Sequence, residues 1–302
     1  MQVNPSSPIP IPHAPHAVQR VLLTGASSQI GHALRAQLRG GGHDMVALSR
    51  SAQSNSAVED AGLHWLQADL ADGWPDCGRF DAVVSFGPMQ ALADALAGLG
   101  EAPCRRLVAT SSMSAVSKRD AALAADRALS QSLRDAEAAL IAQCDRLGIG
   151  WTVLRPTMIY GLGIDANLAP IARRAMRTGL FPYPLGRGLR QPVHAGDVAL
   201  AAWRAVHVDA AIGRTIEVGG GERLRVDRMF LRLRDALPRR TLRLPVPRAV
   251  LAIAARLRPS LRGFASRLDQ DLVADNTQLT TLLGVAPRGF DPDPAAWLGA
   301  SA

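Results

Sequence analysis

Lysine is almost absent from this chain of 302 residues, and aromatic residues and cysteines are scarce. Lys118 is the only lysine, so arginine supplies nearly all of the 34 basic residues and the formal net charge is +8. The three cysteines, Cys77, Cys104 and Cys144, are widely spaced, which argues against a disulfide framework or a CxxC metal site. We therefore predict no metal centre and expect a cytoplasmic protein.

Long apolar runs and a secretory signal are also missing. No stretch is apolar and charge-free enough to be expected to span a bilayer, and the N-terminus lacks a basic region followed by an apolar core. Its five prolines predict a flexible leader over residues 1–19. We interpret the positive charge mainly as a preference for arginine, and predict no nucleic-acid partner.

The chain does contain a regular alternation of short apolar runs and helical patterns. Strands are expected at 21–23, 45–48, 64–66, 82–85, 107–110 and 152–154, and helices at 32–38 and 121–147. Strands that alternate with helices imply parallel pairing with right-handed crossovers. The predicted fold class is therefore α/β, with a Rossmann-type doubly wound parallel sheet and a small C-terminal lobe for substrate.

The sequence VLLTGASSQIG, residues 21–31, joins the first predicted strand to the first predicted helix. Glycines at such a junction let the backbone approach a pyrophosphate, whose charge the helix N-terminus attracts. The stretch resembles the TGxxGxxG motif of the extended short-chain dehydrogenase/reductase family, which includes sugar-nucleotide epimerases and dehydratases. Thr24, Gly25 and Gly31 match, and Ser28 replaces the middle glycine. An ordinary tight turn is the competing interpretation.

The resemblance implies a nicotinamide dinucleotide at the carboxyl ends of the strands. Arg50 stands where an acidic residue would hold the ribose of NAD, and an arginine suits the 2′-phosphate of NADP. NADP is therefore preferred, with an exposed strand-end arginine as the alternative. The predicted cofactor-binding residues are Thr24, Gly25, Ser27, Ser28, Gln29, Ile30, Gly31, Ser49, Arg50, Asp69, Leu70, Ser85, Phe86, Gly87 and Pro156.

The catalytic residues of the family are only partly matched. Ser112 corresponds to the Ser/Thr that hydrogen-bonds the reacting oxygen, although a serine that satisfies its own backbone would fit equally well. Family enzymes then carry YxxxK, in which a lysine lowers the pKa of a proton-transferring tyrosine. Leu129 and Leu133 occupy these two positions. Neither Tyr160 nor Tyr183 is followed by a lysine four residues later.

Lys118 follows Ser112 by six residues, at the mouth of the expected site. As the single lysine of the chain, it is predicted as a second catalytic residue that holds a substrate phosphate or acts as an acid. A solvated loop lysine beside Arg119 and Asp120 is the competing interpretation.

The segment GLRQPVHAGDVA, residues 188–199, resembles a stretch of sugar-nucleotide epimerases in which an arginine binds the substrate pyrophosphate. The resemblance gives this role to Arg190. Asp197 is expected to cap a helix at 198–206, and His194 and Tyr160 are expected to be structural. The predicted domains are an NAD(P)-binding domain over 20–160 and a substrate-binding lobe over 161–302, from which some elements return to the main domain.

Two features point beyond a small-molecule site. The alanine-rich helix expected at 121–147 would allow a homodimer, by analogy with relatives. Residues 247–268 mix five arginines with apolar residues, a pattern typical of a helix on an anionic membrane. Pro259 divides that segment, which favours two short helices covering the lobe.

The sequence leaves two functions open. The first is an NAD(P)-dependent oxidoreductase or epimerase that acts on a nucleotide sugar or a similar anionic small molecule with an atypical catalytic site. The second is a cofactor-binding scaffold, sensor or assembly factor without hydride chemistry.

Overall fold

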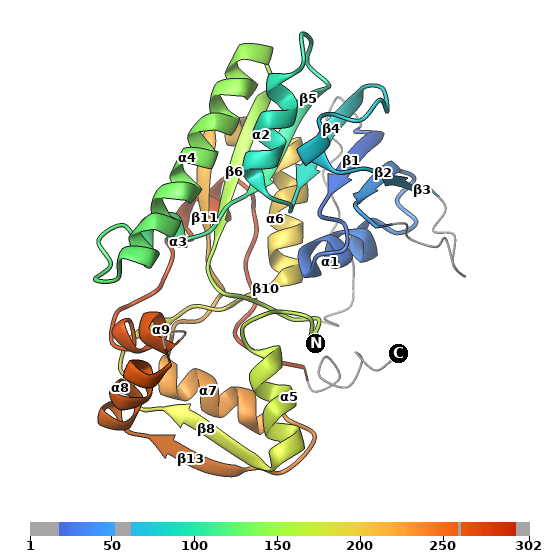
Figure 1. Cartoon of the computed structure of the whole chain (residues 1–302). Coiled ribbons are helices and arrows are strands. Elements are labelled where there is room, and N and C mark those ends of the chain that lie inside the picture. Colours follow the sequence, from blue (N-terminus) through green and yellow to red (C-terminus); the bar gives the residue numbers. More distant parts are fainter. Residues whose placement is uncertain (1–17, 52–61, 259–260, 294–302) are drawn as a thin grey trace.

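The computed structural model describes residues 18–51, 62–258 and 261–293. Most of the predicted leader, residues 1–17, therefore lies outside the described residues. Within them, seven parallel strands form one sheet in the order β11-β6-β5-β4-β1-β2-β3 (Figure 1). The strands are β1 (Arg20–Thr24), β2 (Asp44–Ser49), β3 (Leu63–Gln67), β4 (Phe80–Ser85), β5 (Cys104–Thr110), β6 (Gly150–Pro156) and β11 (Arg214–Val218). The predicted α/β fold is confirmed.

Helices cover both faces of this sheet (Figure 1). Helices α1 (Gln29–Leu38) and α6 (Ala195–His207) share one apolar core with β1, and Trp203 is among its buried members. Helices α2 (Met89–Ala97) and α4 (Ala124–Leu147) bury Leu92 and Leu140 on the other face. Helices on both faces explain why the central strands are almost entirely apolar.

The sheet draws on both halves of the chain. The six strands expected from the sequence all form, with boundaries that extend by one to three residues. The seventh, β11, and helix α6 come from the region after Gly161 and return to the sheet. Such a return was expected from the sequence. Strand β11 and helix α2 were not predicted, because neither Arg214–Val218 nor Met89–Ala97 shows a long periodic pattern.

The C-terminal lobe lies beyond the carboxyl ends of the strands (Figure 1). It is built on the parallel pair β8 (Leu180–Pro184) and β13 (Leu242–Val246), and Phe181 is completely buried in its apolar core. Its helices are α5 (Ala169–Thr178), α7 (Val226–Asp235), α8 (Arg248–Leu257) and α9 (Arg262–Ser266). The prediction of two short helices over residues 247–268 is confirmed by α8 and α9.

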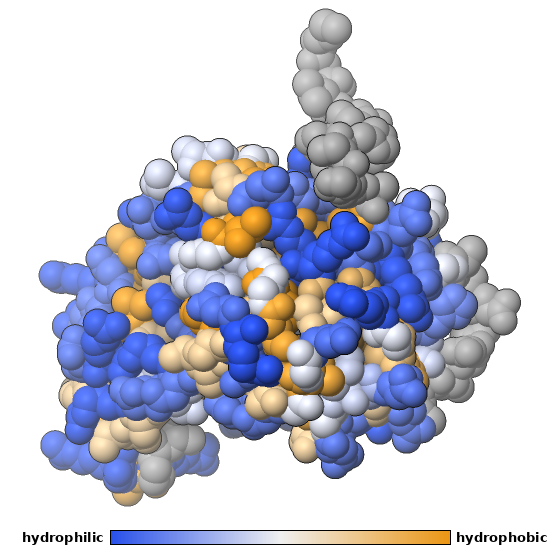
Figure 2. Space-filling view, turned by 90° about the horizontal axis from the view of Figure 1, so that it is seen from above, coloured by the Kyte–Doolittle hydropathy of each residue, from blue (hydrophilic) through white to orange (hydrophobic). Residues whose placement is uncertain are grey.

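Short elements connect the sheet to the lobe. These are the strand pairs β7 (Ile159–Tyr160) with β10 (Val193–His194) and β9 (Leu189–Arg190) with β12 (Leu224–Arg225), the helices α3 (Ser114–Ser117) and α10 (Thr277–Thr281), and the 3-10 turns η1 (Leu70–Asp72) and η2 (Asp209–Ala211). In the part of the chain that the structure describes, no helix has the length and hydropathy needed to cross a bilayer. Figure 2 shows one face of the molecule, where hydrophilic side chains surround smaller apolar patches.

Candidate nucleotide and substrate site

The turn after β1 is shaped by two glycines that leave no room for a side chain. Gly25 has φ +66°, and a Cβ there would lie 2.6 Å from the carbonyl carbon of Phe86, in the loop after β4. A Cβ on Gly31 would lie 2.5 Å from the carbonyl oxygen of Gly25. The loops after β1 and β4 and the first turn of α1 are therefore packed backbone against backbone, as a phosphate-binding turn requires.

Ser28 replaces the middle glycine of the motif without strain. Its φ is −71°, and its hydroxyl accepts the N–H of Gly31 at 3.1 Å, so it caps helix α1. The N–H groups of Gln29 and Ile30 have no hydrogen-bond partner among the residues described, and the buried Oε1 of Gln29 is also unpaired. Ser27 is exposed beside them. The helix N-terminus thus keeps free donors for an anion.

Thr24 and Ser85 stand at the ends of β1 and β4. Both are almost completely buried, and the Thr24 hydroxyl donates to the Ser85 hydroxyl at 2.7 Å. The pair joins the two strands at the point where the chain turns toward Gly25 and Gly87. In this structure the hydrogen bond between them fixes the ends of β1 and β4 relative to each other.

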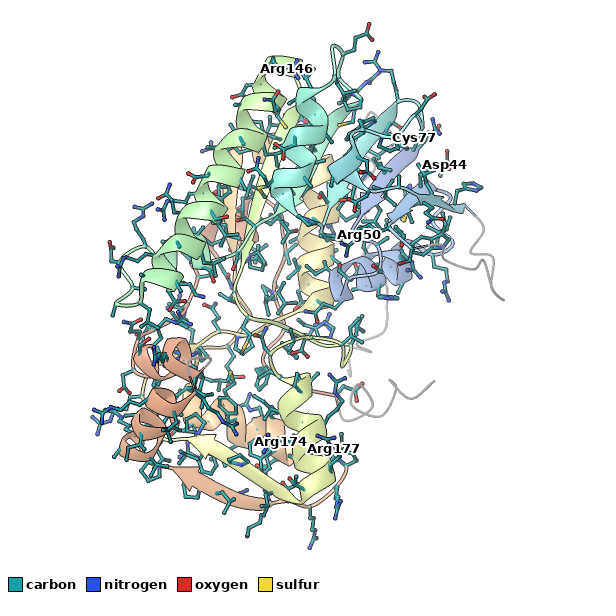
Figure 3. All side chains as sticks on the ribbon, in the orientation of Figure 1. Asp44, Arg50, Cys77, Arg146, Arg174 and Arg177 are labelled. Carbon is teal, nitrogen blue, oxygen red and sulfur yellow. The ribbon has the colours of Figure 1, made fainter. Side chains whose placement is uncertain are left out.

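The residues predicted to hold the adenosine end lie at the carboxyl ends of β2 and β3. Arg50 directly follows β2 and has an exposed side chain (Figure 3), while Ser49 is half-buried. The Asp69 carboxylate accepts the N–H of Ala71 at 3.0 Å and caps η1, and Leu70 is buried in the core. The structure therefore brings Ser49, Arg50 and Asp69 to the same edge of the sheet as Gly25.

A buried polar network lies at the ends of β5 and β6. The Ser111 hydroxyl donates to Oε1 of Glu137 on α4 at 2.5 Å. The Arg155 Nε donates to the same oxygen at 2.9 Å, and its second guanidinium arm reaches Oε2. A side-chain hydrogen bond with Glu137 raises the pKa of Arg155 despite its burial. The network joins the segment after β5 and strand β6 to helix α4.

Ser112, the predicted catalytic serine, accepts the N–H of Ser114 at 3.1 Å and so satisfies the local backbone. An accepting hydroxyl still has its own proton to donate. The hydroxyl of Thr110, at the end of β5, is buried and unpaired. Pro156 ends β6, and its carbonyl accepts the N–H of Met113 at 2.9 Å, which fixes this loop beside the strand ends.

Helix α4 carries apolar side chains at the two positions where the family resemblance predicts a tyrosine and a lysine. Leu129 is 43% exposed and Leu133 is half-buried. Neither side chain can transfer a proton or donate a hydrogen bond. These two positions therefore supply neither an acid nor a base.

Lys118, the second predicted catalytic residue, is not a solvated loop lysine. Its Nζ lies 2.9 Å from the Asp126 carboxylate, which also pairs with Arg267 of the lobe, and all three side chains are mostly buried. Burial would raise the pKa of Asp126, but hydrogen bonds from Arg267 and Lys118 outweigh it and hold that pKa below its ordinary value. The cluster links α3 and α4 to the loop after α9.

Arg190, the predicted phosphate ligand, is 6% exposed. Its guanidinium donates to the main-chain carbonyls of Leu189 and Gln270 at 2.8 and 2.7 Å and to that of Arg267 at 2.8 Å. Burial, with Arg267 nearby, lowers the pKa of Arg190 to about 10. Much of its hydrogen-bonding capacity therefore holds the segment 267–270 in place.

The expected helix cap near Arg190 is corrected. Helix α6 begins at Ala195, and His194 is its cap, with Nδ1 accepting the N–H of Gly196 at 3.0 Å. Asp197 instead pairs with Arg288 from the far end of the chain, at 2.8 Å. The structural assignment of Tyr160 is confirmed, since its buried hydroxyl donates to the Gly289 carbonyl at 3.1 Å.

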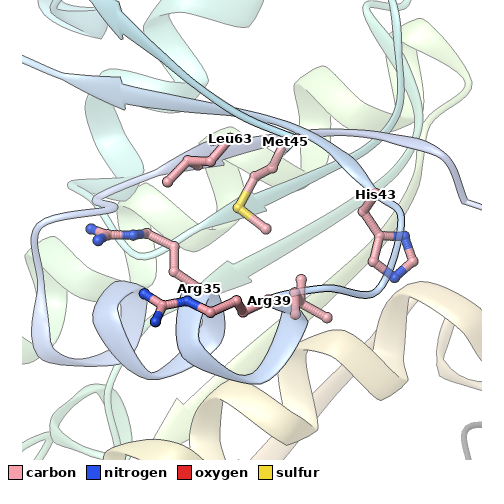
Figure 4. A pocket seen from close by; sticks show the side chains of 7 residues that line it. Arg35, Arg39, His43, Met45 and Leu63 are labelled. Carbon is pink, nitrogen blue, oxygen red and sulfur yellow. The ribbon is translucent and has the colours of Figure 1, made fainter. Parts of the chain in front are cut away.

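A small pocket lies away from this edge (Figure 4). It is lined by Arg35, Leu38, Arg39, His43, Met45, Gly62 and Leu63. Met45 and Leu63 stand at the starts of β2 and β3, so the pocket is at the opposite end of those strands from Gly25 and Arg50. It does not coincide with the predicted cofactor site.

The comparisons with known proteins agree with this geometry. Residues 21–100 match the family described as the NAD dependent epimerase/dehydratase family. The match spans β1 to α2 and includes the turn at Gly25, so the predicted family resemblance is confirmed. No curated protein matches the chain.

Solved structures share the fold over most of the chain. MoeE5 in complex with UDP-glucose and NAD is 20% identical, with a TM-score of 0.66, over 89% of this chain and 93% of that chain. The UDP-glucuronic acid 4-epimerase from Bacillus cereus, in complex with UDP-glucuronic acid and NAD, is 15% identical, with a TM-score of 0.66, over 89% and 94%. A putative epimerase from Burkholderia cenocepacia is 19% identical, with a TM-score of 0.60, over 76% and 84%.

Asp126, Ser130 and Glu137 were not among the site residues predicted from the sequence. The three residues are buried and share the inward face of α4, which continues with the apolar Leu140 and Cys144. A signal was present in the spacing, because positions 126, 130 and 137 repeat at helical intervals in line with 140 and 144. Polar residues on a face that is otherwise apolar mark the part of the helix beside the candidate site.

Proposed function

We propose that this protein binds a nicotinamide dinucleotide at the carboxyl ends of β1, β2 and β4. The turn at Gly25 and Gly31 carries the proposal, because backbone packing there leaves no room for side chains and the first turn of α1 keeps unpaired N–H groups. The buried, unpaired atoms of Gln29 and Thr110 fit a ligand that supplies hydrogen-bond partners along this edge.

We further propose that the protein is an NAD(P)-dependent enzyme of the epimerase/dehydratase kind that acts on a nucleotide sugar or a similar anionic small molecule. Solved structures of the same fold are complexes with UDP-sugars and NAD, which supports this class of substrate. The bound dinucleotide would accept and return hydride. Ser112 would donate a hydrogen bond to the reacting oxygen, and Arg190 would orient an anionic group at the rim of the lobe.

The proton transfer in this proposal is assigned to Lys118 or a water molecule, since Leu129 and Leu133 supply neither acid nor base. Lys118 donates to Asp126, which positions its ammonium group between α3 and the lobe. We also propose that this protein is a cytoplasmic homodimer. Residues 20–160 would form the NAD(P)-binding domain and residues 161–302 the substrate lobe.

The alternative is a cofactor-binding scaffold, sensor or assembly factor without hydride chemistry. Two observations favour it. Leu129 and Leu133 on α4 are apolar, and the guanidinium of Arg190 already donates hydrogen bonds to three main-chain carbonyls. The deciding experiment measures binding of NAD, NADH, NADP and NADPH, and then turnover of UDP-glucose and UDP-glucuronic acid with the preferred cofactor. Binding without turnover supports the scaffold, and no binding of any dinucleotide contradicts both functions.

Arg50 is proposed to select NADP, whereas similar structures were solved in complex with NAD. We expect Arg50→Ala to weaken NADPH binding about tenfold and to leave NADH binding nearly unchanged, because only the 2′-phosphate offers the guanidinium a charged acceptor. Titration of each cofactor checks this. Arg105→Ala is the matched control, since Arg105 is equally exposed at the start of β5. Equal losses for both cofactors would remove the selective role of Arg50.

The missing proton-transfer pair provides a test of the enzyme against the scaffold. We expect the double variant Leu129→Tyr with Leu133→Lys to raise UDP-sugar turnover by about 100-fold, the lower range of general acid–base catalysis. Each single variant should gain much less, because the lysine acts by lowering the pKa of the tyrosine. A folded double variant that binds cofactor but shows no gain would contradict a substrate pocket competent for hydride transfer.

A further inference from the structure

Helix α8 presents an apolar face to solvent. Val250, Ile253 and Leu257 follow helical spacing, and their exposed fractions are 53%, 57% and 79%. The opposite face of the helix buries Leu251 and Ala255 against the lobe. The lobe therefore does not need the outer three side chains for its own core, and a contiguous exposed apolar face of this kind marks an interaction surface.

The chain segment that carries this face has only positive charges, although acidic residues outside the segment pair with Arg243, Arg248 and Arg267. Residues 236–268 contain eight arginines and no aspartate or glutamate. When these eight are removed from the 34 basic residues of the chain, the remainder equals the 26 acidic residues, so this segment accounts for the whole net charge of +8. Arg240, Arg256 and Arg258 are exposed and have no ion-pair partner in the described part of the chain.

The surface continues onto the paired strands β8 and β13. Leu242 pairs in register with Leu180, and Leu244 pairs with Pro182, and all four side chains are exposed. Strands and helix lie at the end of the lobe away from the seven-stranded sheet (Figure 1). Arg174 and Arg177 add exposed positive charge on α5 of the same lobe (Figure 3).

The positive charge of this surface distinguishes among three possible binding partners: a second copy of the chain, a nucleic acid and an anionic membrane. A second copy of the chain would place unpaired arginines such as Arg240, Arg256 and Arg258 against the same arginines of the first copy, and these charges repel each other. A nucleic acid would match the charge but would leave Val250, Ile253 and Leu257 without an apolar partner. An anionic bilayer offers both phosphate groups for the arginines and an acyl boundary for the apolar side chains.

We propose that α8, with the adjoining edge of β13, docks this protein on the surface of an anionic membrane. Val250, Ile253 and Leu257 enter the boundary between headgroups and acyl chains, and Arg240, Arg256 and Arg258 bind lipid phosphates. The proposal does not depend on the activity proposed above, because the surface is remote from the turn at Gly25.

Vesicle flotation of the full chain tests the proposal. We expect binding to vesicles that contain phosphatidylglycerol, little binding to pure phosphatidylcholine, and release at high salt. Arg256→Ala and Arg258→Ala should each weaken binding about fivefold, the contribution of one arginine near an anionic surface. Leu257→Glu should weaken it at least as much. All three side chains are exposed, so the variants should unfold at the wild-type temperature.

Matched controls lie on other surfaces of the molecule. Ile212→Glu introduces the same charge at a residue that is 41% exposed, and Arg105→Ala removes an exposed arginine from the main domain. Neither should change flotation. The proposal is overturned if anionic vesicles do not bind, if neutral vesicles bind equally, or if the controls weaken binding as much as the α8 variants. It is also overturned if Leu257→Glu abolishes a dimer seen by light scattering while vesicle binding persists.

Discussion

Gly25→Ala is expected to abolish most nucleotide binding and to lower the stability of the fold. At φ +66° an alanine costs about 1–2 kcal/mol in backbone strain alone. Its Cβ would also lie 2.6 Å from the carbonyl carbon of Phe86, so the loops after β1 and β4 must separate. Because the proposed phosphate site is made of these two loops and the start of α1, we expect cofactor affinity to fall by more than about tenfold, which corresponds to 1.4 kcal/mol.

The matched control for this change is Gly40→Ala. Gly40 follows α1 with φ +75°, yet a Cβ there meets no atom within 4 Å. The two substitutions therefore share the backbone strain, and only the first adds the collision between the loops. Both variants should unfold at a lower temperature than the wild type, whereas only Gly25→Ala should weaken the binding of NADH and NADPH in titrations. Equal effects on affinity would show that the close packing at Gly25 is irrelevant to binding.

Glu137→Gln is expected to be the most destabilising polar substitution in the main domain. The side chain is 7% exposed and accepts hydrogen bonds from Ser111 and Arg155. The glutamine keeps the size of the side chain but leaves the mostly buried Arg155 without a compensating charge. Removal of one partner from a buried pair costs about 3–5 kcal/mol, and denaturant unfolding measures this loss.

Two comparisons show whether the loss comes from the unpaired charge. The double variant Glu137→Leu with Arg155→Leu should recover much of the stability, because it removes both charges together. Glu101→Ala breaks an exposed pair with Arg79, whose charges lie 3.7 Å apart, and should cost less than about 1 kcal/mol. If Glu137→Gln costs no more than Glu101→Ala, the buried network does not stabilise the region between β5, α4 and β6.

The sequence predicted a structural feature well where a single short segment contains the whole motif. The turn over residues 21–31 carries its own strand, glycines and helix start, so the nucleotide-binding edge was predictable from the sequence. The division of residues 247–268 was also predictable, since a proline in the interior of a helix breaks it. The five arginines and the apolar residues of 247–268 were visible too, but the sequence did not show which of the apolar side chains are exposed.

The partners of the charged residues were decided by tertiary structure alone. Lys118 looked free in the sequence, but the fold places Asp126 and Arg267 around it from a helix and a distant lobe. The sequence predicts Arg190 as a phosphate ligand, and the fold adds hydrogen bonds from its guanidinium to the carbonyls of Arg267 and Gln270. Periodicity specifies which face of an element is inward. The contacts of Arg267 with Asp126 and of Gln270 with Arg190 join residues that are about 80 to 140 positions apart, and only chain folding can bring such residues together.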